Sequence, residues 1–508
     1  MTKNEMNSVI EYLEAVAGRN PKKLAVIDQR ESITYEKLLE LTRRAGTLVA
    51  GKCQKSAPVV VFGEKSYLSL ACMLGVVQGG CFYVPLNPEQ PKDRVEKILE
   101  VLQPKVMLVS AACMERAKDL AFSGEIVSFD TCVGTKIEDD LRRERRRKAH
   151  KEDPLYGIFT SGSTGTPKCV LVSHQCVLDF IPHFIEETGL LSTDVFANQA
   201  PFDFDVSVKD IYSSLALGAT ILLIPKELFA LPTCLLDYIC DNHATVLIWA
   251  VSAMCQISGL KGFDYRIPTD LRRVMFSGES MPIKQLKIWR EALPELPFVN
   301  LYGPTEITCN CTYYWIAPGE PLPEKLPIGK AFGGREVFLL DERGQRVTQP
   351  GISGEICVTG ESISLGYYHN TEQTKKSFIL YGPEKKRTYR TGDMAYWNPK
   401  NQLVFDGRKD FQIKHMGHRI ELEEIENALN SLAGIVRSCC LFDREKNKII
   451  CFYVGDVEKT QLKKQLKLSL PGYMVPQKLC SIDRMPMNKN GKMDRNQLMT
   501  WAKEGLGS

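Results

Sequence analysis

The feature that most constrains the fold is an alternation of short apolar runs with helical stretches over the first three-fifths of the chain. Runs such as Val59–Phe62, Ala219–Ile224 and Phe298–Leu301 are rich in branched apolar residues and are flanked by glycine or proline. Such runs are typical of strands buried on both faces of a parallel sheet. Between such runs, Leu68–Gly79 and Ile283–Leu293 are predicted to form crossover helices. The predicted fold class is therefore α/β.

The pattern changes after about residue 329. Residues 335–368 and 387–406 contain strand-like runs broken by turn signals, which predicts a mostly antiparallel, β-rich part. Beyond it, apolar residues three or four apart predict a helix that starts near Leu422, followed by two strands and another helix. The predicted division is a large N-terminal domain, a hinge and a small mobile α+β domain, over residues 1–406, 407–410 and 411–508.

Composition excludes several classes of protein. Hydrophobic residues make up 44% and charged residues 25%, as in an ordinary soluble globular protein. The net charge is only +4, which gives no case for nucleic acid as a partner. The 17 cysteines include no C-x-x-C pair, and neither a secretory signal nor a membrane span is visible. We therefore expect a cytoplasmic protein with reduced thiols, without a zinc site and without a membrane partner.

The strongest local motif directly follows the predicted strand that ends at Phe159, and it reads Thr160-Ser161-Gly162-Ser163-Thr164-Gly165-Thr166-Pro167-Lys168. Small hydroxyl residues and two glycines allow successive backbone N–H groups to face an anion, and the lysine adds a positive charge. It is not a Walker A loop, because proline precedes the lysine and cysteine follows it. A flexible surface loop is the alternative, but the position directly after a buried strand favours a phosphate-binding loop.

Five further segments follow this loop in order. They are Phe204-Asp205-Val206-Ser207, Asn300-Leu301-Tyr302-Gly303-Pro304-Thr305-Glu306, Tyr389-Arg390-Thr391-Gly392-Asp393, Gly407-Arg408-Lys409-Asp410-Phe411-Gln412-Ile413-Lys414 and Asn490-Gly491-Lys492. The set resembles the adenylate-forming enzyme superfamily, in particular the amino-acid adenylation domains of nonribosomal peptide synthetases and the D-alanine–carrier protein ligases. The resemblance extends over almost the whole chain, from Ile33 to Lys492.

The resemblance implies a two-step reaction with ATP and Mg²⁺. A carboxylate is joined to the α-phosphate of ATP with release of pyrophosphate, and the acyl group then passes to a thiol. The implied phosphate-binding residues are Thr160, Ser161, Gly162, Ser163, Thr164, Gly165 and Lys168. The implied adenine- and ribose-binding residues are Gly278, Glu279, Ser280, Asn300, Tyr302, Gly303, Thr305, Asp393 and Arg408. Glu306 matches the magnesium ligand, and Lys492 matches the catalytic lysine that bridges the reacting carboxylate and the α-phosphate.

The resemblance also implies the class of substrate. Asp205 matches the aspartate that pairs with the α-ammonium of an amino acid, which fatty-acid and aryl-acid substrates lack. The implied side-chain pocket is lined by Val206, Lys209, Ile248, Met275, Ser277, Leu301, Cys309 and Asn310. Lys209 either binds a substrate carboxylate or fills space with its aliphatic stem. The small and polar lining residues favour a small or polar amino acid.

Three further positions carry expected roles in thiol transfer. Phe204 resembles the aromatic gate of the thiol tunnel, Asp410 matches the hinge, and Gly417 matches the glycine that lets a pantetheine arm pass. Because only sixteen residues follow Lys492 and no phosphopantetheine-bearing serine motif precedes it, we expect a separate carrier protein as the acceptor. The alternatives are a D-alanine–carrier protein ligase of teichoic acid D-alanylation, an acyl-CoA synthetase, and a nucleotide-binding scaffold without catalysis.

Overall fold

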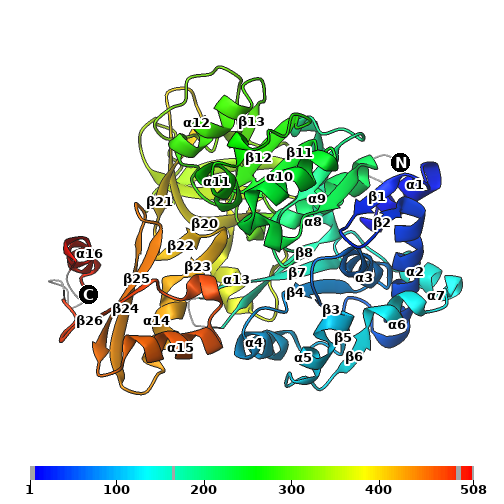
Figure 1. The fold of residues 1–508 in the computed structure, drawn as a ribbon, viewed down its shortest axis with the longest axis horizontal. Coiled ribbons are helices and arrows are strands. Elements are labelled where there is room, and N and C mark those ends of the chain that lie inside the picture. The colour runs from blue at the N-terminus through cyan, green and yellow to red at the C-terminus, as the bar shows by residue number, and fades with distance from the viewer. Residues whose placement is uncertain (1–5, 163–165, 488–492, 506–508) are drawn as a thin grey trace.

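The computed structural model describes residues 6–162, 166–487 and 493–505, and Figure 1 shows two large sheets with helices around them. Each sheet is mainly parallel, as the apolar runs predict. The predicted strand at Val59–Phe62 is observed as Pro58–Phe62, and the predicted helix at Ile283–Leu293 is observed as Ile283–Ala292. The α/β fold class is therefore confirmed.

Seven strands of the described chain form the first sheet, in the order β18-β8-β7-β4-β3-β5-β6. Their bounds are β3 Pro58–Phe62, β4 Phe82–Leu86, β5 Val106–Val109, β6 Glu125–Ser128, β7 Pro154–Thr160, β8 Lys168–Ser173 and β18 Gly366–Tyr367. The β4, β3, β5 and β6 strands pair in parallel, whereas β7 and β8 form an antiparallel hairpin. The predicted phosphate-binding loop is the turn of this hairpin.

A second sheet, counted over the same described ranges, contains nine strands in the order β15-β14-β13-β12-β11-β9-β10-β1-β2. Their bounds are β1 Leu24–Ile27, β2 Ser32–Thr34, β9 Val195–Asn198, β10 Thr220–Leu223, β11 Val246–Ala250, β12 Arg273–Ser277, β13 Phe298–Tyr302, β14 Thr312–Ile316 and β15 Lys330–Ala331. The six strands from β1 to β13 in this order are parallel. Ligand sites of such sheets form beyond the carboxyl ends of the strands.

Helices bury both faces of the two sheets. Apolar side chains of α1, α2, α3, α8 and α9 form one continuous core with both sheets, and α10, α11 and α12 cover the outer face of the nine-stranded sheet. The outer face of the seven-stranded sheet packs against α4 and α5. The bounds are α1 Ile10–Arg19, α2 Tyr35–Lys52, α3 Tyr67–Gln78, α4 Lys92–Leu102, α5 Met114–Lys118, α6 Phe129–Gly134, α7 Asp139–Arg147, α8 His174–Thr188, α9 Val206–Leu217, α10 Pro232–Asp241, α11 Val251–Gly259 and α12 Ile283–Ala292.

A smaller antiparallel sheet follows, as the turn signals predict. Its strands are β16 Arg335–Leu340, β17 Gly354–Gly360, β19 Phe378–Tyr381, β20 Lys386–Trp397 and β21 Leu403–Arg408, and α13 spans Thr371–Ser377. The β20 and β21 strands pair so that Asp393 lies opposite Arg408. This register brings together two residues that were both expected at the ribose.

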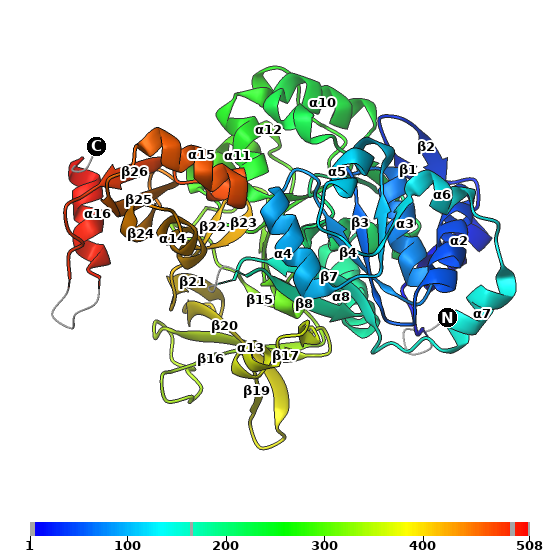
Figure 2. The ribbon, with the colours of Figure 1, turned by 90° about the horizontal axis from the view of Figure 1, so that it is seen from below.

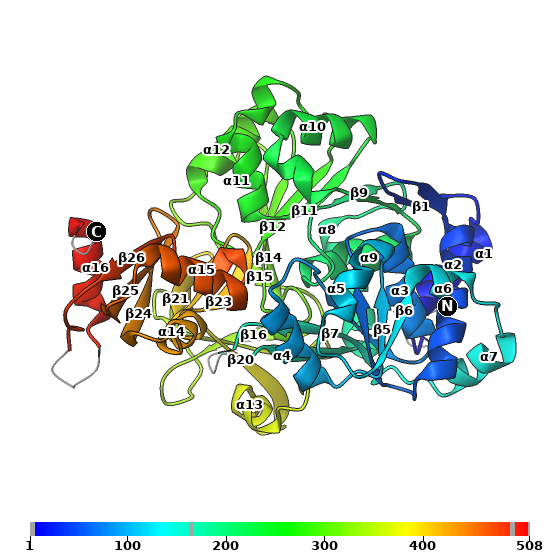
Figure 3. The same cartoon turned by 60° about the horizontal axis from the view of Figure 1, so that its bottom comes forward.

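The C-terminal region beyond this sheet has cores of its own. It contains the β22–β23 hairpin and a three-stranded sheet with α14 and α15 in one cluster and α16 in another. Figures 2 and 3 show it beside the large region, with α15 next to α4. The bounds are β22 Gln412–His415, β23 His418–Glu421, α14 Leu422–Asn430, β24 Ile435–Asp443, β25 Lys448–Gly455, α15 Lys459–Ser469, β26 Lys478–Ser481 and α16 Arg495–Glu504. The hinge itself stays a prediction. No helix of the described ranges has both the length and the apolarity to cross a bilayer.

Candidate active site

The predicted phosphate-binding loop joins β7 to β8 and contacts the C-terminal region. Thr160 pairs with Lys168 at the base of the hairpin. The loop turns tightly at Gly162, because a Cβ there would lie 2.1 Å from the carbonyl oxygen of Thr166. The Ser161 hydroxyl donates to the backbone oxygen of Arg419 at 2.8 Å. Ser163, Thr164 and Gly165, which complete the predicted loop, lie outside the described residues.

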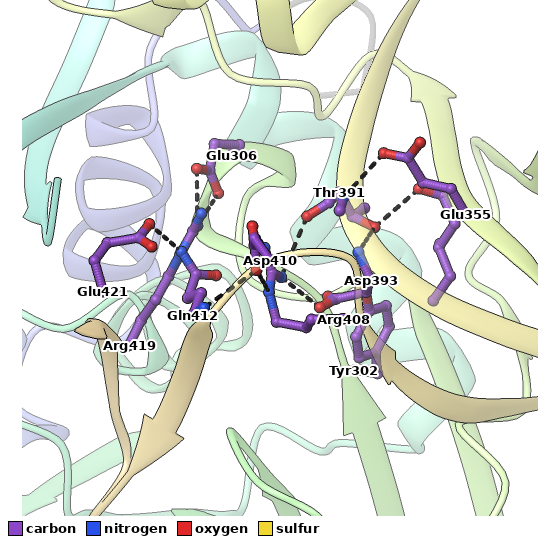
Figure 4. Close-up of polar contacts among 12 residues, drawn as sticks. Tyr302, Glu306, Glu355, Thr391, Asp393, Arg408, Asp410, Gln412, Arg419 and Glu421 are labelled. Carbon is purple, nitrogen blue, oxygen red and sulfur yellow. Dashed lines mark hydrogen bonds and ion pairs between the residues drawn. The ribbon is translucent and has the colours of Figure 1, made fainter. Parts of the chain in front are cut away.

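Glu306 lies fully buried in the short helix that follows β13. Arg419, on β23, donates to both of its carboxylate oxygens at 2.8 Å (Figure 4). The Tyr367 hydroxyl donates to one of these oxygens at 2.8 Å. Burial alone would raise the pKa of Glu306, but Arg419 and Tyr367 hold it below its ordinary value. The carboxylate is therefore ionised, and in this arrangement its charge is neutralised by the C-terminal region.

A second polar cluster links the predicted adenine and ribose positions to the predicted hinge. The Tyr302 hydroxyl donates to Asp393 at 2.5 Å, and Arg408 donates to the other oxygen of the same carboxylate (Figure 4). The same guanidinium binds Asp410 through two hydrogen bonds of 2.6 and 2.7 Å. Lys414 lies 5.6 Å from the centre of the Tyr302 ring. One arginine therefore holds a predicted ribose-binding carboxylate and the predicted hinge carboxylate together.

The tip of the β22–β23 hairpin lies at the carboxyl ends of β11 and β12. Gly417 has a φ of +80° at this tip, and its N–H donates to the carboxylate of Glu279. A Cβ at this position would lie 3.4 Å from Ala250 and 3.5 Å from Ser252. Gly278, another predicted nucleotide-binding position, precedes Glu279 and has a φ of +97°. Ser280 follows Glu279 in the chain, and the remaining predicted positions, Asn300, Gly303 and Thr305, lie on β13 and directly after it. A conformation that favours glycine thus coincides with close approach of two regions.

Aromatic rings fill the space beside this hairpin. The rings of Phe204 and His418 pack edge to face with 4.8 Å between centroids, and His418 stacks on Tyr473 with 3.5 Å between centroids. Burial and, to a smaller extent, the neighbouring charge of Arg94 lower the pKa of His418 to about 3, so the imidazole is neutral. The predicted gate residue is thus in direct contact with the C-terminal region.

The predicted side-chain pocket lies between α9 and three neighbouring strands of the nine-stranded sheet. Asp205 immediately precedes α9, and burial raises its pKa. Lys209, in the second turn, donates to Asn310 at 2.7 Å and lies 3.4 Å from the Ser277 hydroxyl. The other predicted lining residues are all buried, and they are Val206, Ile248, Met275, Leu301 and Cys309. Ile248 and Met275 are direct neighbours on β11 and β12.

Lys492, the predicted catalytic lysine, lies outside the described residues. Two contacts between the regions were not predicted from the sequence. Arg419 binds Glu306, and Glu424 of α14 accepts from Arg94 of α4 at 2.5 Å and from the N–H of Gly162 at 3.3 Å. Arg419 lies two residues after Gly417, but nothing in the local pattern indicates its distant partner.

The sequence and the fold of this chain are similar to those of known proteins. A family model described as AMP-binding enzyme matches residues 13–368. The chain is 31% identical to a D-alanine–D-alanyl carrier protein ligase of Bacillus licheniformis, with 96% of this chain and 98% of the ligase covered. It is 30% identical to zwittermicin A synthase ZmaJ of Bacillus cereus, with 97% and 95% covered. It spans only 14% of surfactin synthase subunit 1 of Bacillus subtilis, at 31% identity. The crystal structure of IdnL1 superposes with a TM-score of 0.84 at 27% identity, covering 96% of this chain and 100% of that one.

Proposed function

Because this chain belongs to the AMP-binding enzyme family, we propose that it activates an amino acid as an aminoacyl adenylate and transfers it to a carrier-protein thiol. The reaction consumes ATP, releases pyrophosphate in the first step and releases AMP in the second. The resulting ligase is of the AMP-forming, acid–thiol type.

The observation that carries the proposal is the position of Asp205 beside the buried residues of the predicted side-chain pocket. Asp205 directly precedes α9, it is half-buried, and burial raises its pKa. An α-ammonium pairs with such a carboxylate through a charge-assisted hydrogen bond, which offsets the cost of removing the carboxylate from water. An acyl substrate without an amino group offers no such partner, which disfavours an acyl-CoA synthetase.

The nucleotide is proposed to lie between the phosphate-binding loop and the polar cluster. Tyr302 offers its ring to adenine, and Asp393 offers its carboxylate to the ribose hydroxyls, a common task for a carboxylate in nucleotide sites. Arg408 already orients Asp393 through one hydrogen bond. The loop from Thr160 to Lys168 is proposed to bind the phosphates through backbone N–H groups, hydroxyls and the lysine ammonium.

Glu306 is proposed to hold the magnesium ion. A single carboxylate fits Mg²⁺, which usually takes one or two protein carboxylates together with water and phosphate oxygens. In this structure the Arg419 guanidinium donates to both carboxylate oxygens of Glu306. Glu306 fits the ion once Arg419 moves away and frees these oxygens. When bound, the ion supplies charge neutralisation for the pyrophosphate leaving group.

Different residues of the chain are proposed to serve adenylation and thiol transfer. In adenylation, Lys492 is proposed to steady the negative charge that grows between the carboxylate and the α-phosphate. For thiol transfer, the hairpin tip at Gly417 is proposed to border the path of the pantetheine arm, with Phe204 as its gate. The contact of Gly417 with Glu279 and the Arg419–Glu306 pair support the thiol-transfer arrangement for the pose seen here.

A D-alanine–carrier protein ligase is the second candidate. The observation in its favour is that the chain spans 98% of such a ligase from Bacillus licheniformis. The two candidates share the same chemistry and differ in the amino acid and in the carrier.

The test is amino-acid-dependent exchange of pyrophosphate into ATP, measured with each common amino acid in both stereochemical forms. We expect exchange with an amino acid and none with its desamino analogue, because only the former pairs with Asp205. Equal exchange with both would refute the role of Asp205. Exchange with no amino acid would refute the proposed function.

A further inference from the structure

The side-chain pocket contains a buried cation that the proposed reaction does not use. Lys209 lies on α9 and is 1% exposed. Within the described ranges, its hydrogen-bond partners are the amide oxygen of Asn310 at 2.7 Å and the hydroxyl of Ser277 at 3.4 Å. Both partners are neutral. Since an ammonium has three donors, one N–H remains for a bound molecule.

The carboxylate that compensates Lys209 before substrate binds is Asp205. The two residues are four positions apart with helical backbone at Asp205, so their side chains lie on the same helix face. Burial raises the pKa of Asp205 and lowers that of Lys209, and in each case the charge of the other residue opposes the shift. Asp205 is therefore one of the carboxylates whose charge stabilises the Lys209 ammonium.

A second carboxylate, Asp210, directly follows Lys209 on the same helix. Asp210 accepts a hydrogen bond from Asn198 at 2.7 Å, and burial raises its pKa to about 7. Lys65 donates to the backbone oxygens of Asn198 and Gln199 at 3.0 Å and adds its charge to this side of α9. The charges of Lys209 and Lys65 both oppose the rise in the pKa of Asp210, and the hydrogen bond that Asp210 accepts comes from Asn198 rather than from Lys209.

Substrate binding changes this balance. Once the α-ammonium pairs with Asp205, this carboxylate is shared between two cations, while the substrate carboxylate is consumed in the bond to the α-phosphate. A neutral substrate side chain would thus add one positive charge to a buried site, and a buried charge without a partner is costly. A side chain that ends in a carboxylate restores neutrality and accepts the free N–H of the ammonium.

Apolar side chains from three neighbouring strands complete the predicted lining. Ile248, Met275 and Leu301 belong to β11, β12 and β13, and all three are buried. The polar end consists of Lys209 and its two partners.

We infer that the chain activates an acidic α-amino acid, aspartate or glutamate in D or L form, and that Lys209 binds the side-chain carboxylate. This inference rests on the proposed function and names its substrate class.

The test compares acids with their amides, which have nearly the same shape. Pyrophosphate exchange is measured with aspartate, glutamate, asparagine, glutamine, alanine, serine and glycine, in D and L forms where they exist. We expect kcat/KM for the preferred acid to exceed that of its amide by about 10²–10⁴-fold, because a site with a buried polar group rejects ligands that leave it unpaired. Preference for alanine, serine or glycine would overturn the inference while leaving the proposed function intact, and exchange with no amino acid would overturn both.

Substitution of Lys209 tests the residue itself. Lys209→Met keeps most of the stem and removes the charge, so we expect the acid-over-amide ratio to fall to about one or below. An unchanged ratio in this variant would refute the role of Lys209. Stabilisation by ATP in a thermal-shift assay shows that the variant is folded, and Lys209→Gln replaces it if it is not. Lys464→Met, an exposed position on α15, is the matched control and should keep the wild-type ratio.

Discussion

The buried ion pair between Arg94 and Glu424 predicts a selective loss of the second half-reaction. Arg94 lies on α4 and Glu424 on α14, and their side chains are only 7% and 4% exposed. The other oxygen of Glu424 accepts from the N–H of Gly162. This pair therefore holds the C-terminal region against both α4 and the phosphate-binding loop in the pose that we assign to thiol transfer.

The perturbation is Arg94→Met, which leaves Glu424 buried without its cation. Removal of one partner of a buried ion pair costs about 3–5 kcal/mol. The cost falls only on the pose that buries Glu424, so it shifts the equilibrium between poses by roughly 10²–10⁴-fold, at about 1.4 kcal/mol for each factor of ten. We expect the rate of thiol transfer to fall by up to this factor of about 10²–10⁴ and the rate of adenylation to change little.

The assay measures pyrophosphate exchange and single-turnover loading of a carrier protein on the same preparation. Arg94→Met combined with Glu424→Gln should recover much of the loading, because a neutral amide tolerates burial better than an unpaired carboxylate. Arg116→Met, at an exposed position, is the control. Equal loss of exchange and loading in Arg94→Met, or loss of exchange alone, would refute the assignment of this pose to thiol transfer.

Four further predictions concern other parts of the site. Lys492→Ala should lower pyrophosphate exchange by about 10²–10³-fold while a nucleotide-binding assay stays unchanged, and near-normal exchange would exclude the catalytic role. Gly417→Leu should block carrier loading and spare exchange, because the added side chain would enter the contact with Ala250 and because φ is +80° there; equal loss of both activities would count against it. Glu306→Gln should raise the magnesium concentration needed for half-maximal exchange, and an unchanged magnesium titration would remove Glu306 as the ligand. Asp210 has a pKa raised to about 7 by burial, so the folded state binds more protons than the unfolded state between pH 4 and 7, and stability falls there as pH rises. In urea unfolding, Asp210→Asn should lose this part of the pH dependence, which amounts to at most about 1.4 kcal/mol per pH unit, and parallel pH profiles of variant and wild type would contradict it.

The parts of the fold that were predictable have strong local patterns. The strand at Pro58–Phe62 and the helix at Tyr67–Gln78 were both visible, because apolar runs bounded by glycine or proline mark buried strands and long apolar stretches mark buried helices. The strand at Lys478–Ser481 and the helix at Arg495–Glu504 were not predicted. Each is short and lies at the margin of the C-terminal region, where packing rather than local pattern decides the structure.

The candidate site likewise contains residues that local motifs predict and contacts that they do not predict. Residues within ordered motifs were found by position, and Tyr302, Asp393 and Arg408 do come together in space. The partners of Glu306 and Glu424 were not found, because each pair joins residues more than one hundred positions apart. Such pairs depend on how the C-terminal region sits against the large region, which no local pattern records.

The separate cores of the C-terminal region have a consequence for the construction of hybrid enzymes. All members of its two apolar clusters lie between residues 413 and 502, and none belongs to the clusters of the two large sheets. A graft made after Asp410 would therefore leave every core whole on both sides of the junction. The donor must still supply an arginine at position 419 and a carboxylate at position 424, to meet Glu306 and Arg94 of the host. Compatibility of the two halves is set first by matched charges, and these can be read from an alignment before any gene is built.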